Sequence, residues 1–127
     1  MSVNNCPFCN LEPGRRVIAQ SAHFFCVKDK FPVTNGHSLI VSKRHCVDYF
    51  ELTKEEKIDL IEMIDIVCEL LTKESHLDGF NIGFNAKEAA GQTVFHTHIH
   101  VIPRVTGDIA NPRGGIRNII SKNKDSY

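Results

Sequence analysis

The stretch His96-Thr97-His98-Ile99-His100-Val101-Ile102 carries three histidines at strictly alternating positions, followed by apolar residues. Side chains two residues apart lie on one face of a β-strand, so the three imidazoles are predicted to line one side of a strand over residues 93–103. Ile99 and Val101 would face the opposite side and the core. Chance alternation is a weak explanation for this pattern. A metal site and a catalytic site both remain open, because imidazole serves as ligand, base and nucleophile.

The residues just before the histidine strand are small or carry neutral polar groups. Ala90-Gly91-Gln92-Thr93-Val94 would let backbone amides approach a phosphate closely, and Asn85, Gln92 and Thr93 add neutral donors. Beside three histidines, this arrangement suits a phosphate ester better than hydride or acyl transfer. Without the histidines, the same residues would be interpreted as an ordinary polar turn.

Three other apolar stretches predict further strands. Residues 22–28 and 39–41 are rich in apolar side chains, and residues 80–84 alternate apolar with small or polar ones. The connection over residues 29–36 ends in Asn35-Gly36, a step typical of tight reversals. Strands, then one helix, then strands again indicate an α+β fold with an antiparallel sheet.

A single long helix is predicted between these strands. Thr53 would cap its N-terminus and form a capping box with Glu56, and the helix would run to about Glu74. The charged residues of its first turn, 54–57, are expected to be solvated. Apolar residues that recur at helical spacing are expected to face the core: Ile58, Ile61, Ile64, Cys68 and Leu71. Ile66, Val67 and Leu70 widen this stripe, so the helix is expected to bury more than half of its circumference.

Length and charge restrict the kinds of protein that this sequence can encode. The 127 residues suit a single domain over 1–127, with a core at 6–107 and a tail over 108–127 that is loosely ordered or held at a dimer interface. Its 15 basic and 15 acidic residues cancel, so no global field attracts nucleic acid or an anionic membrane. The sequence has no apolar run of membrane-spanning length and no signal-peptide pattern, and its odd number of cysteines favours a reducing compartment. We therefore expect a cytoplasmic protein.

These residues together resemble the histidine triad (HIT) family of nucleotide hydrolases and transferases. The triad itself carries the resemblance, and Gly91-Gln92-Thr93-Val94 with Pro103-Arg104 is similar to the diadenosine polyphosphate hydrolase branch. The resemblance extends over residues 6–107. Further matching positions upstream occur in the same order and at the same spacing as in the family: Asp29, Pro32, Gly36-His37, Leu39-Ile40-Val41 and Lys43-Arg44-His45.

The resemblance implies a fold and a set of residue roles. The fold would be a five-stranded antiparallel sheet packed with one long helix and a short one, paired in a homodimer. His98 would attack the α-phosphorus and form a nucleotidyl-histidine intermediate, while His100 and Gln92 would complete the catalytic set, with no catalytic metal required. The nucleotide-binding positions would be Asp29 at the ribose hydroxyls, the Lys30 backbone, and Asn85, Gly91, Gln92, Thr93, His98 and His100 around the phosphate.

Cys6-Pro7-Phe8-Cys9 places two thiols at a spacing that closes on one metal ion. A redox pair is the alternative, although such pairs usually lie between a strand and a helix start. Some HIT proteins with this N-terminal motif use a histidine after the third strand and the first triad histidine as further ligands. The resemblance therefore implies a structural zinc site made by Cys6, Cys9, His45 and His96.

The expected activity is hydrolysis of a nucleotide, with adenine favoured, at its α-phosphorus. Dinucleoside polyphosphates are the first expected substrates, and adenylated amines or lysines, the substrates of an adenosine phosphoramidase, are the second. A protein of another class, a non-catalytic nucleotide-binding or scaffold protein, stays open, although such a protein need not keep a nucleophile at the centre of its site. A zinc module that binds nucleic acid is disfavoured by the zero net charge.

Overall fold

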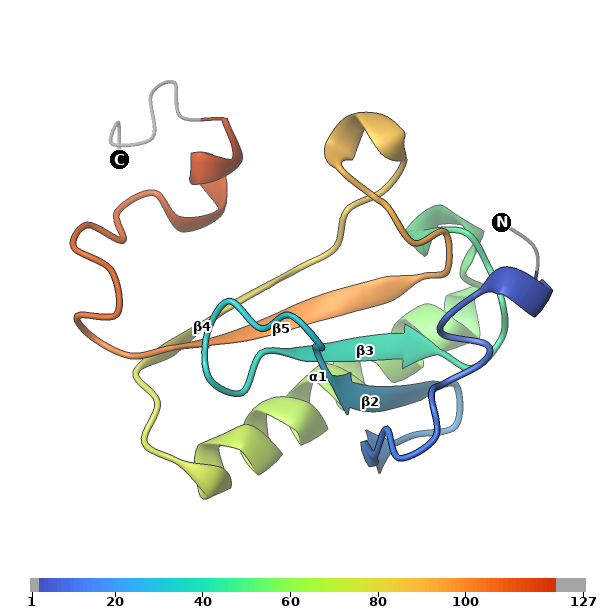
Figure 1. Ribbon diagram of the computed structural model, residues 1–127, viewed down its shortest axis with the longest axis horizontal. Coiled ribbons are helices and arrows are strands. Elements are labelled where there is room, and N and C mark those ends of the chain that lie inside the picture. Colours follow the sequence, from blue (N-terminus) through green and yellow to red (C-terminus); the bar gives the residue numbers. More distant parts are fainter. Residues whose placement is uncertain (1–2, 121–127) are drawn as a thin grey trace.

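A five-stranded antiparallel sheet forms the centre of the computed structural model, which describes residues 3–120 (Figure 1). The strands follow the order β1-β2-β3-β5-β4, and every neighbouring pair is antiparallel. This arrangement confirms the predicted α+β fold. The sequence prediction lacked β1. The strands are β1 Val17–Gln20, β2 Phe24–Lys28, β3 Ser38–Ser42, β4 Gly79–Gly83 and β5 His98–Arg104.

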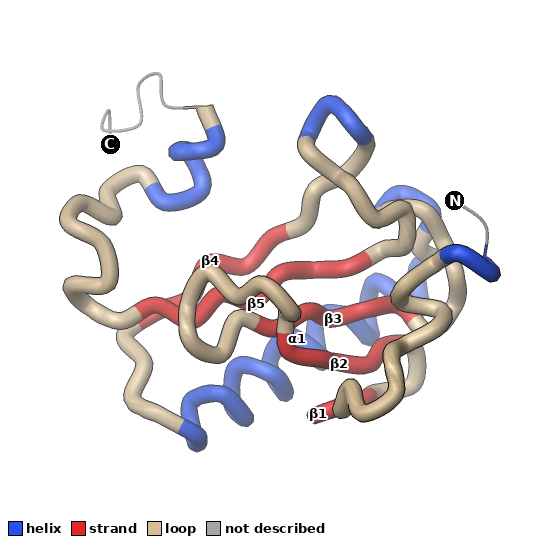
Figure 2. The backbone as a smooth tube through the Cα atoms, in the orientation of Figure 1, coloured by secondary structure: helices blue, strands red, loops and turns tan. Residues whose placement is uncertain are grey.

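One long helix, α1 (Lys54–Glu74), packs against one face of the sheet (Figure 2). It begins at the predicted capping box, in which the Glu56 amide donates to the Thr53 hydroxyl and the Thr53 amide donates to the Glu56 carboxylate. The second, short helix that the resemblance implies is not present within residues 3–120. Apart from α1, the helical elements there are 3-10 turns: η1 Val3–Asn5, η2 Tyr49–Glu51, η3 Glu88–Ala90 and η4 Gly115–Ile119. Over the same residues, none of the helices is both long enough and apolar enough to cross a bilayer.

Side chains of β5 alternate between the two faces of the sheet. Ile99 and Val101 are buried in the cluster that α1 covers, as the alternation predicts. His98 and His100 lie on the opposite face, where the register pairs them with Val41 and Leu39 of β3. A second apolar cluster covers that face beside the histidines, formed by the buried residues Cys6, Phe8, Val27, Leu39 and Val41.

The predicted start of the histidine strand at residue 93 is wrong, because β5 begins only at His98. The Thr97 amide and hydroxyl both donate to the Cys46 carbonyl, which lies in the loop after β3. The His96 ring is also drawn to the end of β3, where it donates from Nε2 to the Ser42 carbonyl at 2.7 Å. These bonds to residues 42–46 replace the regular ladder, so His96 precedes the strand.

The predicted core face of α1 is wrong only in part: Val67 and Leu71 are buried as expected, and Ile64 and Cys68 pack against the core. Ile58 and Ile61 are 58% and 66% exposed, whereas the buried positions are Glu56, Leu60, Met63, Val67 and Leu71. Both sets have helical spacing, so the apolar pattern alone does not decide between them. Glu56 faces inward at the start of this buried stripe, where its carboxylate receives two hydrogen bonds from the Arg44 guanidinium. The expectation that residues 54–57 are all solvated fails at this position.

Replacing Glu56 with glutamine is expected to lower the free energy of unfolding by about 2 to 3 kcal/mol at pH 7. The Arg44 guanidinium is the main cause that holds the pKa of the Glu56 carboxyl at about 2. A pKa below the unfolded value stabilises the fold above about pH 4.5, and this contribution disappears as the pH falls toward 2. Urea unfolding at several pH values measures the effect, with Glu55→Gln as the control because Glu55 is an exposed neighbour in the same turn. A difference in unfolding free energy between Glu56→Gln and the wild type that stayed constant down to pH 2 would contradict a lowered pKa of Glu56.

Candidate active site and metal centre

A cavity of about 540 Å³ lies on the histidine face of the sheet. The connection between β2 and β3, β3 itself, β5 and the β4–β5 connection all contribute side chains to it. Every nucleotide-binding residue expected from the sequence borders this one cavity: Asp29, Lys30, Asn85, Gly91, Gln92, Thr93, His98 and His100. Residues separated by about 70 positions in the chain therefore meet around a space large enough for a small organic ligand.

His98 borders the cavity and keeps one ring nitrogen free of hydrogen bonds within residues 3–120. Its Nδ1 lies 2.8 Å from the His96 carbonyl, which can only accept, so Nδ1 carries the proton. The Nε2 of the neutral ring then keeps an unshared electron pair. Burial lowers the pKa of His98, which favours this neutral form. The backbone thus fixes His98 in the tautomer that a nucleophile requires.

His100 is held in the opposite sense by His37, which is buried. The Val33 amide donates to His37 Nδ1 at 3.1 Å, so the proton of His37 is on Nε2. His37 Nε2 donates to His100 Nδ1 at 2.9 Å, and His100 must therefore carry its own proton on Nε2. Asp29 lies beside this pair, with a carboxylate oxygen 3.4 Å from His37 Nε2. His100 can consequently donate a hydrogen bond into the cavity while remaining neutral.

Burial keeps this whole histidine group uncharged. Desolvation is the main cause that lowers the pKa of His37 and brings the pKa of His100 to about 4, and the neighbouring histidines lower the latter further. Asp29 acts in the other direction on both rings but does not outweigh burial. These histidines therefore offer one lone pair and one N–H donor without a positive charge of their own.

The loop between η3 and β5 has a rigid internal structure. The Gln92 side chain accepts from the Lys87 amide at 2.8 Å and donates to the carbonyls of Val47 and Val94. Both ends of its amide are therefore already bonded within the protein, although Gln92 borders the cavity. Gly91 follows in the left-handed region at φ 94°, a conformation that glycine adopts without strain. Gln92 thus shapes the loop that presents Gly91 and Thr93.

Several cavity residues were not expected from the sequence. Phe8 lies with its ring centroid 5.0 Å from that of His98, and Leu39, Phe31 and Val33 add apolar surface. Arg15 also borders the cavity; its Nη2 donates to the Lys28 carbonyl, and within residues 3–120 no carboxylate pairs with it. Nothing in the local sequence marks the contacts of Phe8 and Arg15, because they depend on how the N-terminal segment packs over β2 and β3.

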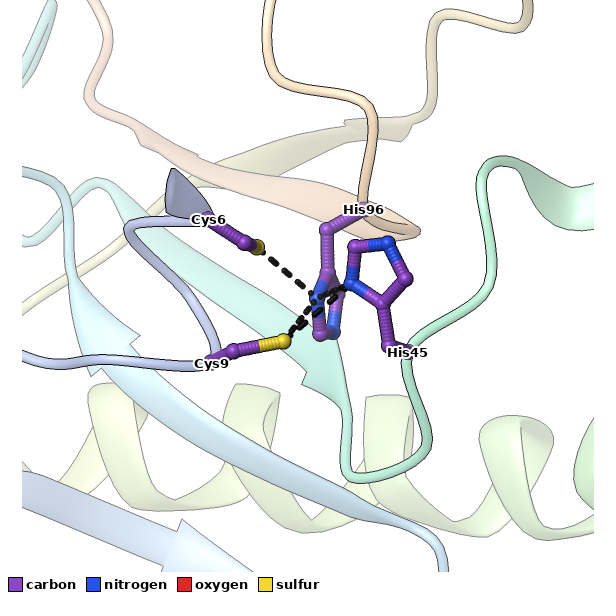
Figure 3. A group of neighbouring side chains, drawn as sticks. All are labelled: Cys6, Cys9, His45 and His96. Atoms are coloured by element: carbon purple, nitrogen blue, oxygen red, sulfur yellow. Dashed lines mark hydrogen bonds between the residues drawn. The ribbon is translucent and has the colours of Figure 1, made fainter. Parts of the chain in front are cut away.

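Four side chains from three parts of the chain meet beside the cavity (Figure 3). Cys6 and Cys9 come from the N-terminal segment, His45 from the loop after β3, and His96 from the residue pair before β5. The structure thus brings together all four ligands that the resemblance implies. One potential ligand atom from each lies within 4.8 Å of the others, and the Sγ and Nδ1 atoms are 3.1 to 3.4 Å apart in the bonded pairs.

The donor set and the tautomer of His96 both fit a tetrahedral zinc ion. Because His96 Nε2 donates to the Ser42 carbonyl, its Nδ1 carries a lone pair toward the cysteines and His45. Zinc bonds of about 2.0 to 2.3 Å at tetrahedral angles place neighbouring ligand atoms about 3.3 to 3.8 Å apart. The spacings of 3.1 to 3.4 Å between the bonded Sγ and Nδ1 atoms lie at or just below the lower end of that range. A carbonyl that fixes the outer nitrogen is also the usual partner of a metal-bound histidine.

Comparison with known proteins gives consistent matches. The HIT domain family model matches residues 10–107. The chain is 32% identical to the adenylylsulfatase HINT3 of Arabidopsis thaliana over 83% of its own length and 55% of that protein, so it spans about half of that relative. A hypothetical histidine triad nucleotide-binding protein from Sulfolobus tokodaii aligns at a TM-score of 0.74 with 30% identity, covering 81% of this chain and 69% of that one. A Zn-bound histidine triad family protein from Mycobacterium smegmatis aligns at a TM-score of 0.70 with 33% identity, covering 87% of this chain and 82% of that one.

Proposed function

Because this chain belongs to the HIT domain family, we propose that it binds a nucleotide in the 540 Å³ cavity and hydrolyses it at the α-phosphorus. The observation that carries the proposal is the bond from His98 Nδ1 to the His96 carbonyl. It leaves Nε2 unprotonated on a ring that borders the cavity with the expected phosphate contacts. A protein that only bound nucleotides would not need this tautomer.

In the first step, the His98 Nε2 lone pair attacks the α-phosphorus and forms a P–N bond. The bond from phosphorus to the leaving oxygen or nitrogen breaks, and the leaving group takes a proton from water where its basicity requires one. His98 keeps its Nδ1 proton on the His96 carbonyl, which stabilises the positive charge of the modified ring. His100 donates from Nε2 to a phosphoryl oxygen, a bond that strengthens as negative charge develops there.

In the second step, water attacks the same phosphorus and the bond to His98 breaks. The electron pair returns to Nε2, and the water gives up one proton, so one water is consumed in each cycle. Dividing the displacement into two steps lowers the barrier that a single attack by water would face. Asp29 would hold the ribose hydroxyls, Phe8 and Leu39 would contact the base, and Asn85 and Thr93 would donate to the phosphate.

The experiment that tests this proposal is detection of the covalent intermediate. Protein is mixed with adenosine 5′-phosphoramidate or diadenosine tetraphosphate, quenched in base within milliseconds to seconds, and measured by intact mass. We expect an adduct of one adenylyl group, absent in His98→Ala and present in His76→Ala, since His76 is exposed and bonds to Asp78 at the surface. Absence of the adduct together with tight AMP binding would favour the alternative of a non-catalytic nucleotide-binding or scaffold protein.

His37 is proposed as a positioning residue for His100. Replacing it with alanine should lower kcat about 10- to 100-fold, because His100 would no longer be restricted to the tautomer that donates to the phosphate. His37→Gln should recover part of the rate, since its amide can donate to His100 Nδ1. Nitrogen-15 NMR of the rings should report a protonated His100 Nε2 in the wild type and mixed tautomers in His37→Ala. An unchanged His100 spectrum beside a slower rate would indicate a merely structural role.

We also propose that Cys6, Cys9, His45 and His96 hold a zinc ion, as the donor set and the Zn-bound relative suggest. When bound, the ion would supply a structural crosslink between the N-terminal segment and the residues that precede β5. A homodimer and a preference for adenine are proposed on the family resemblance. Light scattering of the purified protein, and competition between AMP and GMP for the cavity, would measure these two properties.

A further inference from the structure

Lys87 has a backbone conformation that residues with a side chain rarely adopt. With φ 76° and ψ 162°, it is the only residue other than glycine in the range 3–120 that has a positive φ. This combination of angles is populated almost entirely by glycine, because glycine has no Cβ to clash with the neighbouring backbone. The conformation therefore costs free energy, and other contacts must hold Lys87 in it. The proposed function gives this residue no part.

The strained residue lies at the base of the loop that is expected to bind the phosphate, residues 87–93. The Lys87 amide donates to the Gln92 side chain at 2.8 Å, and the Gln92 amide donates back to the Lys87 carbonyl at 3.2 Å. These two bonds close the loop on itself. Gly91 and Thr93 flank Gln92 directly, and both border the nucleotide cavity. The backbone of Lys87 consequently affects where these two residues lie.

Apolar packing does little to hold this loop in place. Among residues 84–93 only Gln92 is buried, and η3 forms the outer end of a connection that stands away from the sheet (Figures 1 and 2). Two polar contacts attach the loop to the segment after β3. Gln92 Nε2 donates to the Val47 carbonyl at 2.6 Å, and Lys87 Nζ donates to a carboxylate oxygen of Asp48 at 3.1 Å. The position of the loop depends on these two neighbouring contacts.

The carboxylate of Asp48 is buried and needs a cation as its partner. Its side chain is 3% exposed, whereas that of Lys87 is 72% exposed. One carboxylate oxygen accepts from the Phe50 amide at 2.9 Å, and the other accepts from Lys87 Nζ. A buried carboxylate that loses its cation is costly, so this pair resists separation more than a fully exposed ion pair does. The pair is therefore suited to hold the Lys87 backbone in its strained conformation.

We propose that Lys87 is a positioning residue, whose ion pair with Asp48 holds a strained backbone in place and thereby presents Gly91 and Thr93 to the phosphate. The inference rests on the proposed function, because it assumes that this loop contacts the phosphate of a bound nucleotide. Lys87 is not among the residues that border the cavity, so it acts through the loop and not on the substrate. The chemical step at His98 is the one already given.

Two substitutions at Lys87 separate the ion pair from the strain. Lys87→Met still carries a Cβ and loses the charge, whereas Lys87→Gly loses the charge but allows the same backbone without strain. Calorimetric titration should show a Kd for AMP about tenfold higher in Lys87→Met and within about threefold of the wild type in Lys87→Gly. The Kd for adenosine, which has no phosphate, should stay within about twofold in both variants.

Lys73→Met is the matched control for the loss of a lysine. Lys73 is also an exposed lysine in an ion pair, with Glu69 of α1, and it is not among the residues that border the cavity. This variant should bind AMP and adenosine as the wild type does.

Asp48→Asn tests the other partner of the pair. Asparagine can still cap η2 at the Phe50 amide but carries no charge, so this variant should weaken AMP binding as much as Lys87→Met does. The double variant should be no weaker than either single one, since both substitutions break the same contact. Amide hydrogen exchange in the ligand-free protein should be faster at Gln92 in Lys87→Met than in Lys87→Gly or the wild type, because this amide bonds to the Lys87 carbonyl.

Three results would overturn the inference. The first is unchanged AMP binding in Lys87→Met. The second is equal weakening in Lys87→Met and Lys87→Gly, which would mean that the ammonium group itself meets the phosphate. The third is an equal loss of AMP and adenosine affinity, which would indicate a merely structural role. If AMP binding followed the expected pattern but the wild type formed no adenylyl adduct, the proposed hydrolysis would fail and the positioning role of Lys87 would stand.

Discussion

Replacing His98 with alanine is expected to lower kcat at least about 10⁴-fold while leaving the Kd for AMP within about threefold of the wild type. Loss of the nucleophile in enzymes with covalent intermediates costs about 10⁴ to 10⁶ in rate, because no other group can make the first bond. Affinity should persist because Asp29, Phe8 and the loop at Gly91 and Thr93 stay in place. Steady-state kinetics measures the rate, and titration calorimetry with AMP measures the affinity.

Two comparisons keep this result specific to His98. His76→Ala removes an exposed imidazole without touching the cavity and should retain the wild-type rate. His98→Gln keeps a polar side chain of similar length but no nucleophilic nitrogen, so it should be as slow as the alanine variant. Wild-type turnover in either His98 variant would contradict the covalent mechanism. A slow variant that also lost AMP binding would indicate a collapsed cavity instead.

The sequence predicts those parts of the fold in which a local pattern is compatible with one local structure only. The alternation in His98-Ile99-His100-Val101 determines which side chains face the core, because a one-residue slip would bury two imidazoles under α1. The capping box at Thr53 and Glu56 likewise determines where α1 begins. Neither conclusion depends on residues far away in the chain.

Features that depend on one distant partner were not predictable in the same way. The burial of Glu56 in the first turn of α1 depends on its ion pair with Arg44, and a charged residue in a first turn is normally interpreted as solvated. The role of His37 follows from its bond to His100, 63 residues away. The late start of β5 follows from bonds between Thr97 and Cys46, so a pattern of alternating histidines could not reveal it.

His96 connects the two sites through its backbone and its side chain. Its carbonyl accepts the proton of His98 Nδ1, while its own Nδ1 faces the thiols of Cys6 and Cys9. A ligand atom held by a metal ion would fix the position of this residue and therefore the orientation of the nucleophile. Residues that orient ligands and catalytic groups in this indirect way typically contribute 10- to 100-fold. Metal binding and turnover should consequently be coupled in this protein.

Protein purified without chelator is therefore expected to contain one zinc ion per chain, and its removal should destabilise the fold by about 4 kcal/mol or more. For a domain of this size, that corresponds to a fall in Tm of more than about 10 °C. Cys9→Ser should abolish stoichiometric zinc and lower both Tm and kcat, whereas Cys68→Ser, at a partly buried cysteine of α1 outside the cluster, should retain the metal. Plasma emission spectrometry measures the zinc content and calorimetry the Tm.

The coupling itself is tested by adding zinc back to the metal-free protein. Turnover and Tm should return together in the wild type and in Cys68→Ser, but not in Cys9→Ser. A redox pair at Cys6 and Cys9 predicts a different result: no bound metal, and a mass two daltons lower after mild oxidation. Wild-type protein that contained only traces of zinc would exclude the metal site, and wild-type protein that kept full activity and stability after zinc removal would exclude the coupling. In that case the four side chains around His96 would have to act through their hydrogen bonds alone.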